Sequence, residues 1–239
     1  MKKYGVMVEG EFEERELEHI TARGFRASMW GRVGTYDEYV MKEIVKSYGS
    51  LSVEDKVVLD IGANIGCFSR WAVENGARKV IAIEPEPNNF AMLELNMEGH
   101  ENVVPVNAAL VPFYSGEGVM ELYIAPSGKN PGNSSLSPRR GRSSIFVSTV
   151  HVDAIFTGHP DISVAKIDCE GAEFGLMPVL TRTALEQMAL EYHINGFGTA
   201  NVRECHEMLL KDGWVTTREP KIQENLWQTI AAYRRFAIS

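Results

Sequence analysis

Residues 58–68 read V-L-D-I-G-A-N-I-G-C-F, and this stretch decides the fold of the chain. The β-branched run at 56–60 predicts a short strand that ends in Asp60, and the pattern at 64–75 predicts a helix. Between the two, Gly62 permits a tight turn and Gly66 lets the backbone approach a ligand closely. The helix begins with N–H groups that no helical carbonyl satisfies, and these point toward the same place. We therefore expect a ligand site where the strand ends.

Strand-like and helix-like segments alternate from Leu51 onward. This alternation is typical of an α/β fold with a mostly parallel sheet and helices on both faces. Further strands are predicted at 80–83, 103–106, 119–125, 145–152, 162–168, 188–193, 214–218 and 226–233, the last two as an antiparallel hairpin. Further helices are predicted at 88–98, 172–180 and 202–211.

The first 50 residues lack this alternation of strand-like and helix-like segments. We therefore divide the chain into an N-terminal cap (1–50) and a main domain (51–239). The charge-rich stretch 9–19 is expected to form a solvated helix or turn. Residues 36–48 predict an amphipathic helix that caps the sheet edge or the cofactor.

Composition narrows the function classes. Of the 239 residues, 44% are hydrophobic and 23% are charged, which is ordinary for a globular protein. No apolar run reaches the roughly 18 residues of a membrane span, and the N-terminus lacks the apolar core of a signal peptide. Three widely spaced cysteines argue against a disulfide framework or a zinc site and for a cytoplasmic protein. The net charge of −8 disfavours nucleic acid as a partner.

The segment 126–144 is rich in Ser, Gly, Pro, Asn and Arg and is expected to be a surface loop. It carries Lys129, Arg139, Arg140 and Arg142 in an otherwise acidic protein. Two interpretations stay open. The loop is either a mobile lid that holds a phosphate or carboxylate of the substrate, or a solvated insertion without a ligand.

Three polar residues end successive predicted strands and indicate the kind of ligand. Asp60 would repel a pyrophosphate but attract a cofactor with an ammonium and a sulfonium, and S-adenosylmethionine carries both. Glu84, 24 residues later, is placed to accept the ribose hydroxyls, and Asn107 to meet the adenine. The spacing is G-x-x-x-G and not the dinucleotide fingerprint G-x-G-x-x-G, which counts against an NAD-dependent oxidoreductase as the alternative.

The sequence resembles the FkbM-type class I S-adenosylmethionine-dependent methyltransferases. The matching segments are D-I-G-A-N-I-G-C-F, A-I-E-P and K-I-D-C-E-G-A-E, with weaker similarity in N-A-A-L, N-S-S-L and T-V-H-V-D. The resemblance implies a Rossmann-like seven-stranded sheet with a reversed C-terminal hairpin, and methyl transfer, usually to a hydroxyl of a small molecule or sugar. The expected cofactor-binding residues are Asp60, Gly62, Ala63, Asn64, Gly66, Phe68, Glu84, Pro85, Asn107 and Asp168.

The candidate reacting groups lie at the ends of the fourth and fifth strands of the parallel sheet. They are Asp168, Glu170, Glu191 and His193. Glu191 and His193 alternate along one strand and so point the same way. His193 has the intrinsic pKa best suited to a base, although it can equally be a hydrogen-bonded histidine at a strand end. Glu170 and Glu173 can instead cap the next helix.

Two alternatives for this cluster and for the whole chain stay open. Asp168, Glu191 and His193 can also form a divalent-metal site that ionises a hydroxyl, although we assign no metal ligand. The chain can also be a scaffold that binds S-adenosylmethionine and has lost catalysis. The preferred interpretation is an S-adenosylmethionine-dependent O-methyltransferase that acts on a small molecule or sugar.

Overall fold

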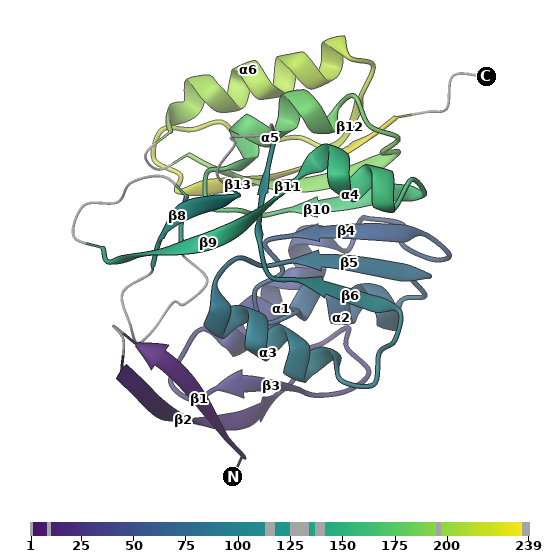
Figure 1. Cartoon of the computed structure of the whole chain (residues 1–239). Coiled ribbons are helices and arrows are strands. Elements are labelled where there is room, and N and C mark those ends of the chain that lie inside the picture. Colours follow the sequence, from purple (N-terminus) through teal and green to yellow (C-terminus); the bar gives the residue numbers. More distant parts are fainter. Residues whose placement is uncertain are drawn as a thin grey trace.

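A twisted seven-stranded sheet runs through the middle of the chain in the computed structural model (Figure 1). The structure describes residues 2–8, 11–112, 118–124, 134–136, 142–194 and 197–235. In spatial order the strands are β12 (Val215–Arg218), β13 (Gln228–Arg234), β11 (Gln187–His193), β10 (Ile162–Ile167), β4 (Val57–Ile61), β5 (Lys79–Ile83) and β6 (Val103–Val106). The expected α/β fold with a mostly parallel seven-stranded sheet is confirmed.

Six of these seven strands run in the same direction, and β13 runs antiparallel to both of its neighbours, β11 and β12. The chain first builds outward from β4 through β5 to β6 and then returns to add β10 on the other side of β4. The strand order therefore reverses between β4 and β10. In open parallel sheets a ligand crevice forms at such a reversal, outside the carboxyl ends of the strands.

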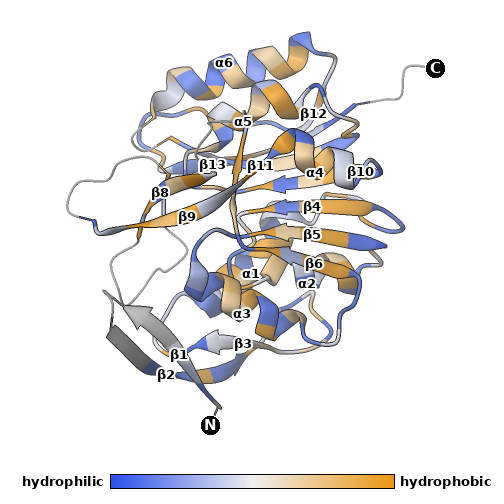
Figure 2. Ribbon diagram, viewed as in Figure 1, coloured by the Kyte–Doolittle hydropathy of each residue, from blue (hydrophilic) through white to orange (hydrophobic). Residues whose placement is uncertain are grey.

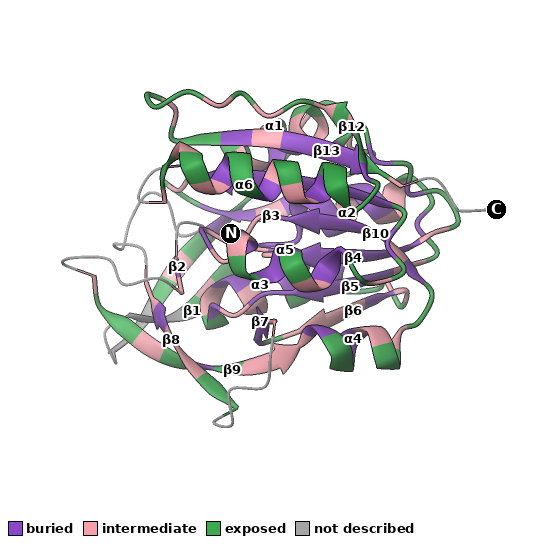
Figure 3. Cartoon of the chain, turned by 90° about the horizontal axis from the view of Figure 1, so that it is seen from above, coloured by how far each residue is buried: buried purple, intermediate pink, exposed green. Residues whose placement is uncertain are grey.

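Helices cover both faces of the sheet. One face packs against α1 (Asp37–Tyr48), α2 (Cys67–Glu74) and α3 (Pro87–Met97). The other face packs against α4 (Val152–Gly158), α5 (Glu173–Leu180) and α6 (Gly198–Lys211). Val202, Cys205 and Leu209 make the buried side of α6, whereas its outer side is exposed (Figure 3). This spacing of three and four residues is that of an amphipathic surface helix.

The central strands are hydrophobic along most of their length because helices bury them on both sides (Figure 2). Every residue of β4 is buried, including Asp60, and so is every residue of β11, including Glu191 and His193. Buried polar residues on such strands need partners within the protein. These buried polar residues therefore mark candidate functional positions on the sheet. Among the described residues, no helix is both long and apolar enough to cross a membrane.

The N-terminal segment corrects one expectation. Residues 9–19 were expected as a helix or turn, but β2 (Glu11–Ile20) is a strand, paired antiparallel with β1 (Lys2–Val8) and β3 (Met29–Arg32). Pairing with distant segments decides this conformation, and the charge-rich local pattern does not reveal it. Leu17, Ile20 and Met29 belong to the same core cluster as α1 to α3. This small sheet thus packs on one helical layer.

A second small sheet lies beside the carboxyl ends of the central strands (Figure 1). In it, β9 (Ser144–His151) pairs with β7 (Ala109–Val111) in parallel and with β8 (Val119–Tyr123) antiparallel. Of the expected lid loop, Lys129, Arg139 and Arg140 lie outside the described residues. Ser135 is described and forms an isolated bridge with Tyr123.

Candidate active site

A cavity of about 740 Å³ opens at the carboxyl ends of the central strands. This volume is in the upper part of the range for small-molecule sites. The cavity is lined by the ends of β4, β5, β10 and β11, by α1, and by the segment around β12 and β13. Ten predicted site residues line it: Gly62, Ala63, Asn64, Phe68, Glu84, Pro85, Asp168, Glu170, Glu191 and His193.

The glycine turn after β4 forms one wall of the cavity. Gly62 has φ +74, and the N–H groups of Gly62 and Ala63 both donate to the Ile83 carbonyl, at 3.0 and 2.9 Å. A Cβ on Gly62 would lie 1.8 Å from the carbonyl oxygen of Asp168, so only glycine fits here. Gly66 lies outside the cavity lining, and its close approach is to Leu93 of α3.

Glu84 connects the loop after β4 with the loop after β5 at this end of the sheet. Its Oε2 accepts a 2.8 Å hydrogen bond from the Asn64 N–H, and its Oε1 accepts a 2.9 Å bond from the Glu86 N–H. The side chain is 5% exposed and lines the cavity. Burial, more than any neighbour, raises the pKa of Glu84 to about 7. A carboxylate has more lone pairs than these two bonds use, and the remaining ones can accept hydroxyls of a ligand.

Asp60 lies under the glycine turn and does not reach the cavity. It is 0% exposed, accepts a 2.7 Å hydrogen bond from Ser69 Oγ, and has Lys166 Nζ 3.2 Å from its Oδ1. Lys166 Nζ also donates to the carbonyls of Ile61 and Gly62. The carboxylate therefore holds a lysine that fixes the turn from beneath. Lys166 is the first residue of the segment K-I-D-C-E-G-A-E, and the sequence alone assigned it no role.

Asn107 also lies outside the cavity lining. Its Nδ2 donates to the carbonyl oxygens of Glu84 and Pro85, at 2.9 and 3.3 Å. The residue thus closes the loop that follows β5. In this arrangement its side-chain amide is directed to the backbone of the loop.

A second polar group gathers where β10 and β11 end. The Tyr48 hydroxyl, from α1, is 3.1 Å from Asp168 Oδ2 and 3.2 Å from Glu191 Oε2. The phenol has one proton to donate, so the two carboxylates compete for it. Burial and then the Asp168 charge raise the pKa of Glu191 to about 8. Sequence reasoning missed Tyr48, because nothing in its helix indicates that it reaches two strands so distant in sequence.

His193 lies between two glutamates. Its Nδ1 is 3.1 Å from Glu173 Oε1, and its Nε2 is 3.5 Å from Glu170 Oε2. Burial opposes the charged form of the ring, but hydrogen bonds and charge from Glu170 and Glu173 outweigh it and raise the pKa of His193 well above its ordinary value. A histidine of ordinary pKa was expected here. The two carboxylates instead favour the imidazolium.

A sequence profile of the methyltransferase FkbM domain matches residues 60–211. The chain belongs to the FkbM methyltransferase family. The match includes the glycine turn, Glu84 and the whole Asp168–His193 group. No curated protein matches the chain at a significant level.

Solved structures resemble this FkbM methyltransferase in fold at low sequence identity. The Methanococcus jannaschii fibrillarin pre-rRNA processing protein has a TM-score of 0.52 at 12% identity, over 98% of this chain and 88% of its own. A Pyrococcus horikoshii protein described as a transferase has a TM-score of 0.55 at 14% identity, over 91% and 71%. Precorrin-6y C5,15-methyltransferase from Geobacter metallireducens has a TM-score of 0.46 at 15% identity, over 86% and 92%.

The class of this FkbM methyltransferase implies S-adenosylmethionine as the methyl donor, and the residues fit that molecule. Glu84 offers a buried carboxylate for two ribose hydroxyls, and the apolar residues Ile83, Pro85 and Leu110 line the cavity near it. The flat adenine ring of the cofactor is suited to such an apolar wall, because polar groups are needed only at the edge of the ring. Asp168 lines the cavity on the side of the second polar group.

Asp168, Glu191 and His193 also meet the geometric requirement of a metal site. One ligand atom from each lies within 4.8 Å of the others. Carboxylates and imidazole are suitable ligands for several divalent ions. The metal-assisted alternative therefore stays open, and removal of metal ions tests it.

The described part of the predicted lid loop reaches the cavity of the FkbM methyltransferase. Ser134, Leu136 and Arg142 line it. Ser135 is buried, and its Oγ donates a 2.9 Å hydrogen bond to the Glu170 carbonyl. This segment thus contacts the loop that carries a candidate catalytic residue.

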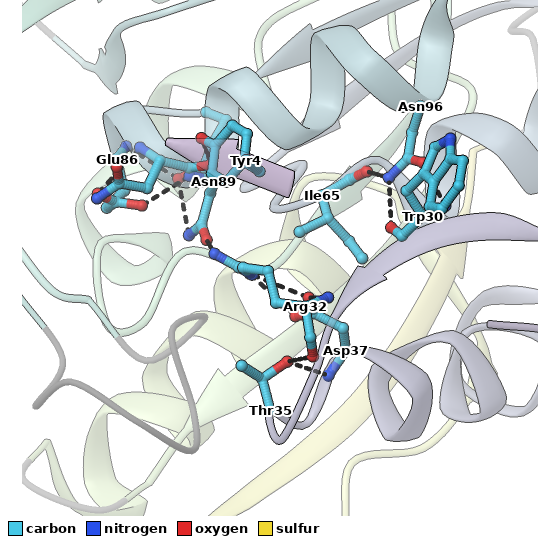
Figure 4. Close-up of polar contacts among 11 residues, drawn as sticks. Tyr4, Trp30, Arg32, Thr35, Asp37, Ile65, Glu86, Asn89 and Asn96 are labelled. Carbon is cyan, nitrogen blue, oxygen red and sulfur yellow. Dashed lines mark hydrogen bonds and ion pairs between the residues drawn. The ribbon is translucent and has the colours of Figure 1, made fainter. Parts of the chain in front are cut away.

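A buried polar network connects the N-terminal segment to the Glu84 side of the cavity (Figure 4). Arg32 donates to both carboxylate oxygens of Asp37, at 2.9 Å each, and to Asn89 Oδ1 at 2.8 Å. With its oxygen held by Arg32, the Asn89 amide turns its Nδ2 toward Glu84 Oε1, 3.5 Å away. Sequence reasoning missed this network, which joins three segments by contacts that no local pattern encodes.

We expect Arg32→Lys to weaken cofactor affinity about fivefold. Lysine keeps the charge beside Asp37 but cannot form the planar fork that also reaches Asn89. The loss of one net hydrogen bond, about 1 kcal/mol, corresponds to that factor. Calorimetry with S-adenosylhomocysteine measures it, with Arg203→Lys on the exposed side of α6 as the control. Equal affinity in both variants would contradict a link from Arg32 to Glu84.

We also expect cofactor affinity to fall as the pH drops below about 7. The pKa of Glu84 is raised to about 7, so acid converts this carboxylate, which we expect to accept the ribose hydroxyls, into the neutral acid. Binding favours the charged form, and affinity at pH 6 should be roughly tenfold lower than at pH 8. Calorimetric titrations across this range measure the effect. Glu84→Gln, which cannot ionise, should show no such dependence.

Proposed function

We propose that this methyltransferase transfers a methyl group from S-adenosylmethionine to a hydroxyl oxygen of a small molecule or sugar. The observation that carries the proposal is the position of His193. His193 lines the cavity together with Asp168, Glu170 and Glu191, and its Nε2 lies 3.5 Å from Glu170 Oε2. An alcohol is a weak nucleophile at neutral pH and needs a group that removes its proton.

The cofactor half of the site would use the residues that join β4 and β5. Gly62, Ala63 and Asn64 form the turn beside it, and Glu84 is placed to accept the ribose hydroxyls. Bound S-adenosylmethionine supplies an electrophilic methyl group on a sulfonium. Lys166 and Asp60 hold the turn in place from beneath.

The acceptor half would use the ends of β10 and β11. His193 Nε2 accepts the hydroxyl proton, and the imidazolium that results lies between Glu170 and Glu173. Because those carboxylates raise the pKa of His193, the ring must lose its own proton before it acts as a base. Tyr48 holds Asp168 and Glu191 together beside it.

The rival functions lack comparable support. An NAD-dependent oxidoreductase is not favoured, because the family match is to methyltransferases. An inactive scaffold has no use for a buried histidine held between carboxylates at the cavity wall. The likeness to fibrillarin is one of fold, and the net charge of −8 gives no support for a nucleic-acid acceptor.

A methyl-transfer assay with isotope-labelled donor tests the proposal. We expect label to appear on oxygen when pools of sugars and hydroxylated small molecules are offered. Label only on nitrogen or on nucleic acid would overturn the acceptor class. Tight S-adenosylhomocysteine binding without turnover on any pool would favour the scaffold. Loss of activity with EDTA and recovery with magnesium or manganese would favour the metal-assisted alternative.

A further inference from the structure

Glu173 is a buried carboxylate that neither lines the cavity nor caps a helix. It is the first residue of α5 and is 0% exposed. No side chain caps α5 at Ala172. Glu173 instead accepts hydrogen bonds from the backbone N–H of Gly171 through Oε2 and of His193 through Oε1, both at 2.8 Å. The carboxylate is thus directed away from its own helix, toward β11.

The same Oε1 fixes the ring of His193. It lies 3.1 Å from Nδ1. An ionised carboxylate can only accept hydrogen bonds, so Nδ1 must carry a hydrogen. A neutral imidazole has a single N–H, which leaves Nε2 with a free lone pair. Nε2 faces Glu170 Oε2 at 3.5 Å, and both residues line the cavity.

The loop between the two glutamates is built to bring them to opposite sides of one ring. Glu170 has φ +53 and Gly171 has φ +106, both in the left-handed region. A Cβ on Gly171 would lie 2.1 Å from the ring of Phe197. Only glycine therefore allows the chain to turn back this tightly. The motif E-G-A-E thus supplies two carboxylates and the glycine that folds them around His193.

The two glutamates differ in a way that separates their roles. The side chain of Glu173 is 0% exposed and holds three groups at short distance, whereas that of Glu170 is 20% exposed and 3.5 Å from the ring. A carboxylate that is buried from solvent and held by several hydrogen bonds is suited to orient a base. Residues behind the reacting groups have this role in many active sites. The more open Glu170 leaves room for a substrate beside Nε2.

We propose that Glu173 is a positioning residue that holds His193 in the Nδ1–H tautomer and directs Nε2 at the acceptor hydroxyl. The catalytic part of this inference rests on the proposed function. When the hydroxyl oxygen forms its bond to the methyl carbon, the carbon–sulfur bond breaks with its electrons on sulfur, and the hydroxyl proton moves to Nε2. The hydrogen on Nδ1 stays against Glu173 throughout. Glu173 therefore takes no proton.

The first test is spectroscopic and needs no substrate. ¹⁵N NMR of histidine-labelled protein distinguishes the two neutral tautomers, at a pH high enough to remove the ring charge, and His193→Gln identifies the signals. We expect wild-type His193 to show protonated Nδ1 and unprotonated Nε2. Glu173→Gln should mix the tautomers, because the glutamine amide can turn either its oxygen or its NH2 to the ring.

Two outcomes overturn the positioning role. One is a wild-type spectrum with the hydrogen on Nε2, a result that does not depend on the folding of any Glu173 variant. The other is a Glu173→Gln spectrum identical to wild type. Glu207→Gln, the same change on the exposed side of α6, is the matched control and should leave the His193 signals unchanged.

Activity then separates this inference from the proposed function. We expect Glu173→Gln to lower kcat at least tenfold with little change in the KM for S-adenosylmethionine, and Glu173→Asp, which keeps the charge, to recover part of the loss. If the tautomer changes and kcat does not, the positioning role stands and His193 is not the base. If kcat falls while the tautomer is unchanged, the positioning role is wrong.

Discussion

Replacing His193 with alanine should lower kcat at least tenfold, and the expected range is about 10²–10⁴-fold, the usual contribution of a general base. The variant removes the nitrogen that we propose receives the hydroxyl proton, and it leaves Glu173 and Glu170 without the ring between them. Cofactor affinity should not change, because Glu84 and the glycine turn lie on other strands. Steady-state kinetics with a hydroxylated acceptor and calorimetry with S-adenosylhomocysteine measure the two effects separately.

The control for this variant is His100→Ala. His100 precedes β6 and so lies near the amino-terminal ends of the parallel strands, whereas the cavity lies at their carboxyl ends. Its replacement should therefore leave kcat unchanged. Full kcat in His193→Ala would show that the base is elsewhere. Loss of cofactor affinity along with kcat would show that the change disturbs the whole site.

Glu84→Ala should lower cofactor affinity by roughly 10- to 150-fold. A charge-assisted hydrogen bond is worth about 1.5–3 kcal/mol, which corresponds to that range. The alanine also leaves the N–H groups of Asn64 and Glu86 without their Glu84 acceptor, so the loops after β4 and β5 lose this connection. Calorimetry with S-adenosylhomocysteine measures the loss.

Glu101→Ala removes a carboxylate from an exposed turn at the opposite edge of the sheet and is the control for charge. It should bind the cofactor as the wild type does. Unchanged affinity in Glu84→Ala would refute the assignment of Glu84 to the ribose, whatever the behaviour of the control.

Local sequence was enough to predict the central sheet. Side-chain size and backbone freedom at neighbouring positions were enough to predict the strand at 56–60, the glycine turn and the helix after it. The structure has β4, the turn and α2 in that order. The same reasoning brought Glu84, Asp168, Glu191 and His193 to one cavity, because the carboxyl ends of parallel strands share an edge.

Contacts between distant segments explain what the sequence did not reveal. Asp60 lies one residue before the end of β4, and Lys166 of the neighbouring strand lies against its carboxylate. Strand β2 forms because β1 and β3 pair with it. The Arg32–Asp37 pair and the reach of Tyr48 into the cavity depend on how the N-terminal segment folds against the sheet. No residue pattern within one segment encodes such partners.

The approach of Gly62 to the Asp168 carbonyl links the movements of two loops at the cavity. The donor would rest on the loop of Gly62 and the acceptor on the loop of Asp168, and these two backbones already touch where a Cβ would be 1.8 Å from the carbonyl oxygen. Neither loop can move inward without displacing the other. A shift of either loop must therefore be accompanied by a shift of the other, so the proposed donor and acceptor halves of the site cannot be repositioned independently.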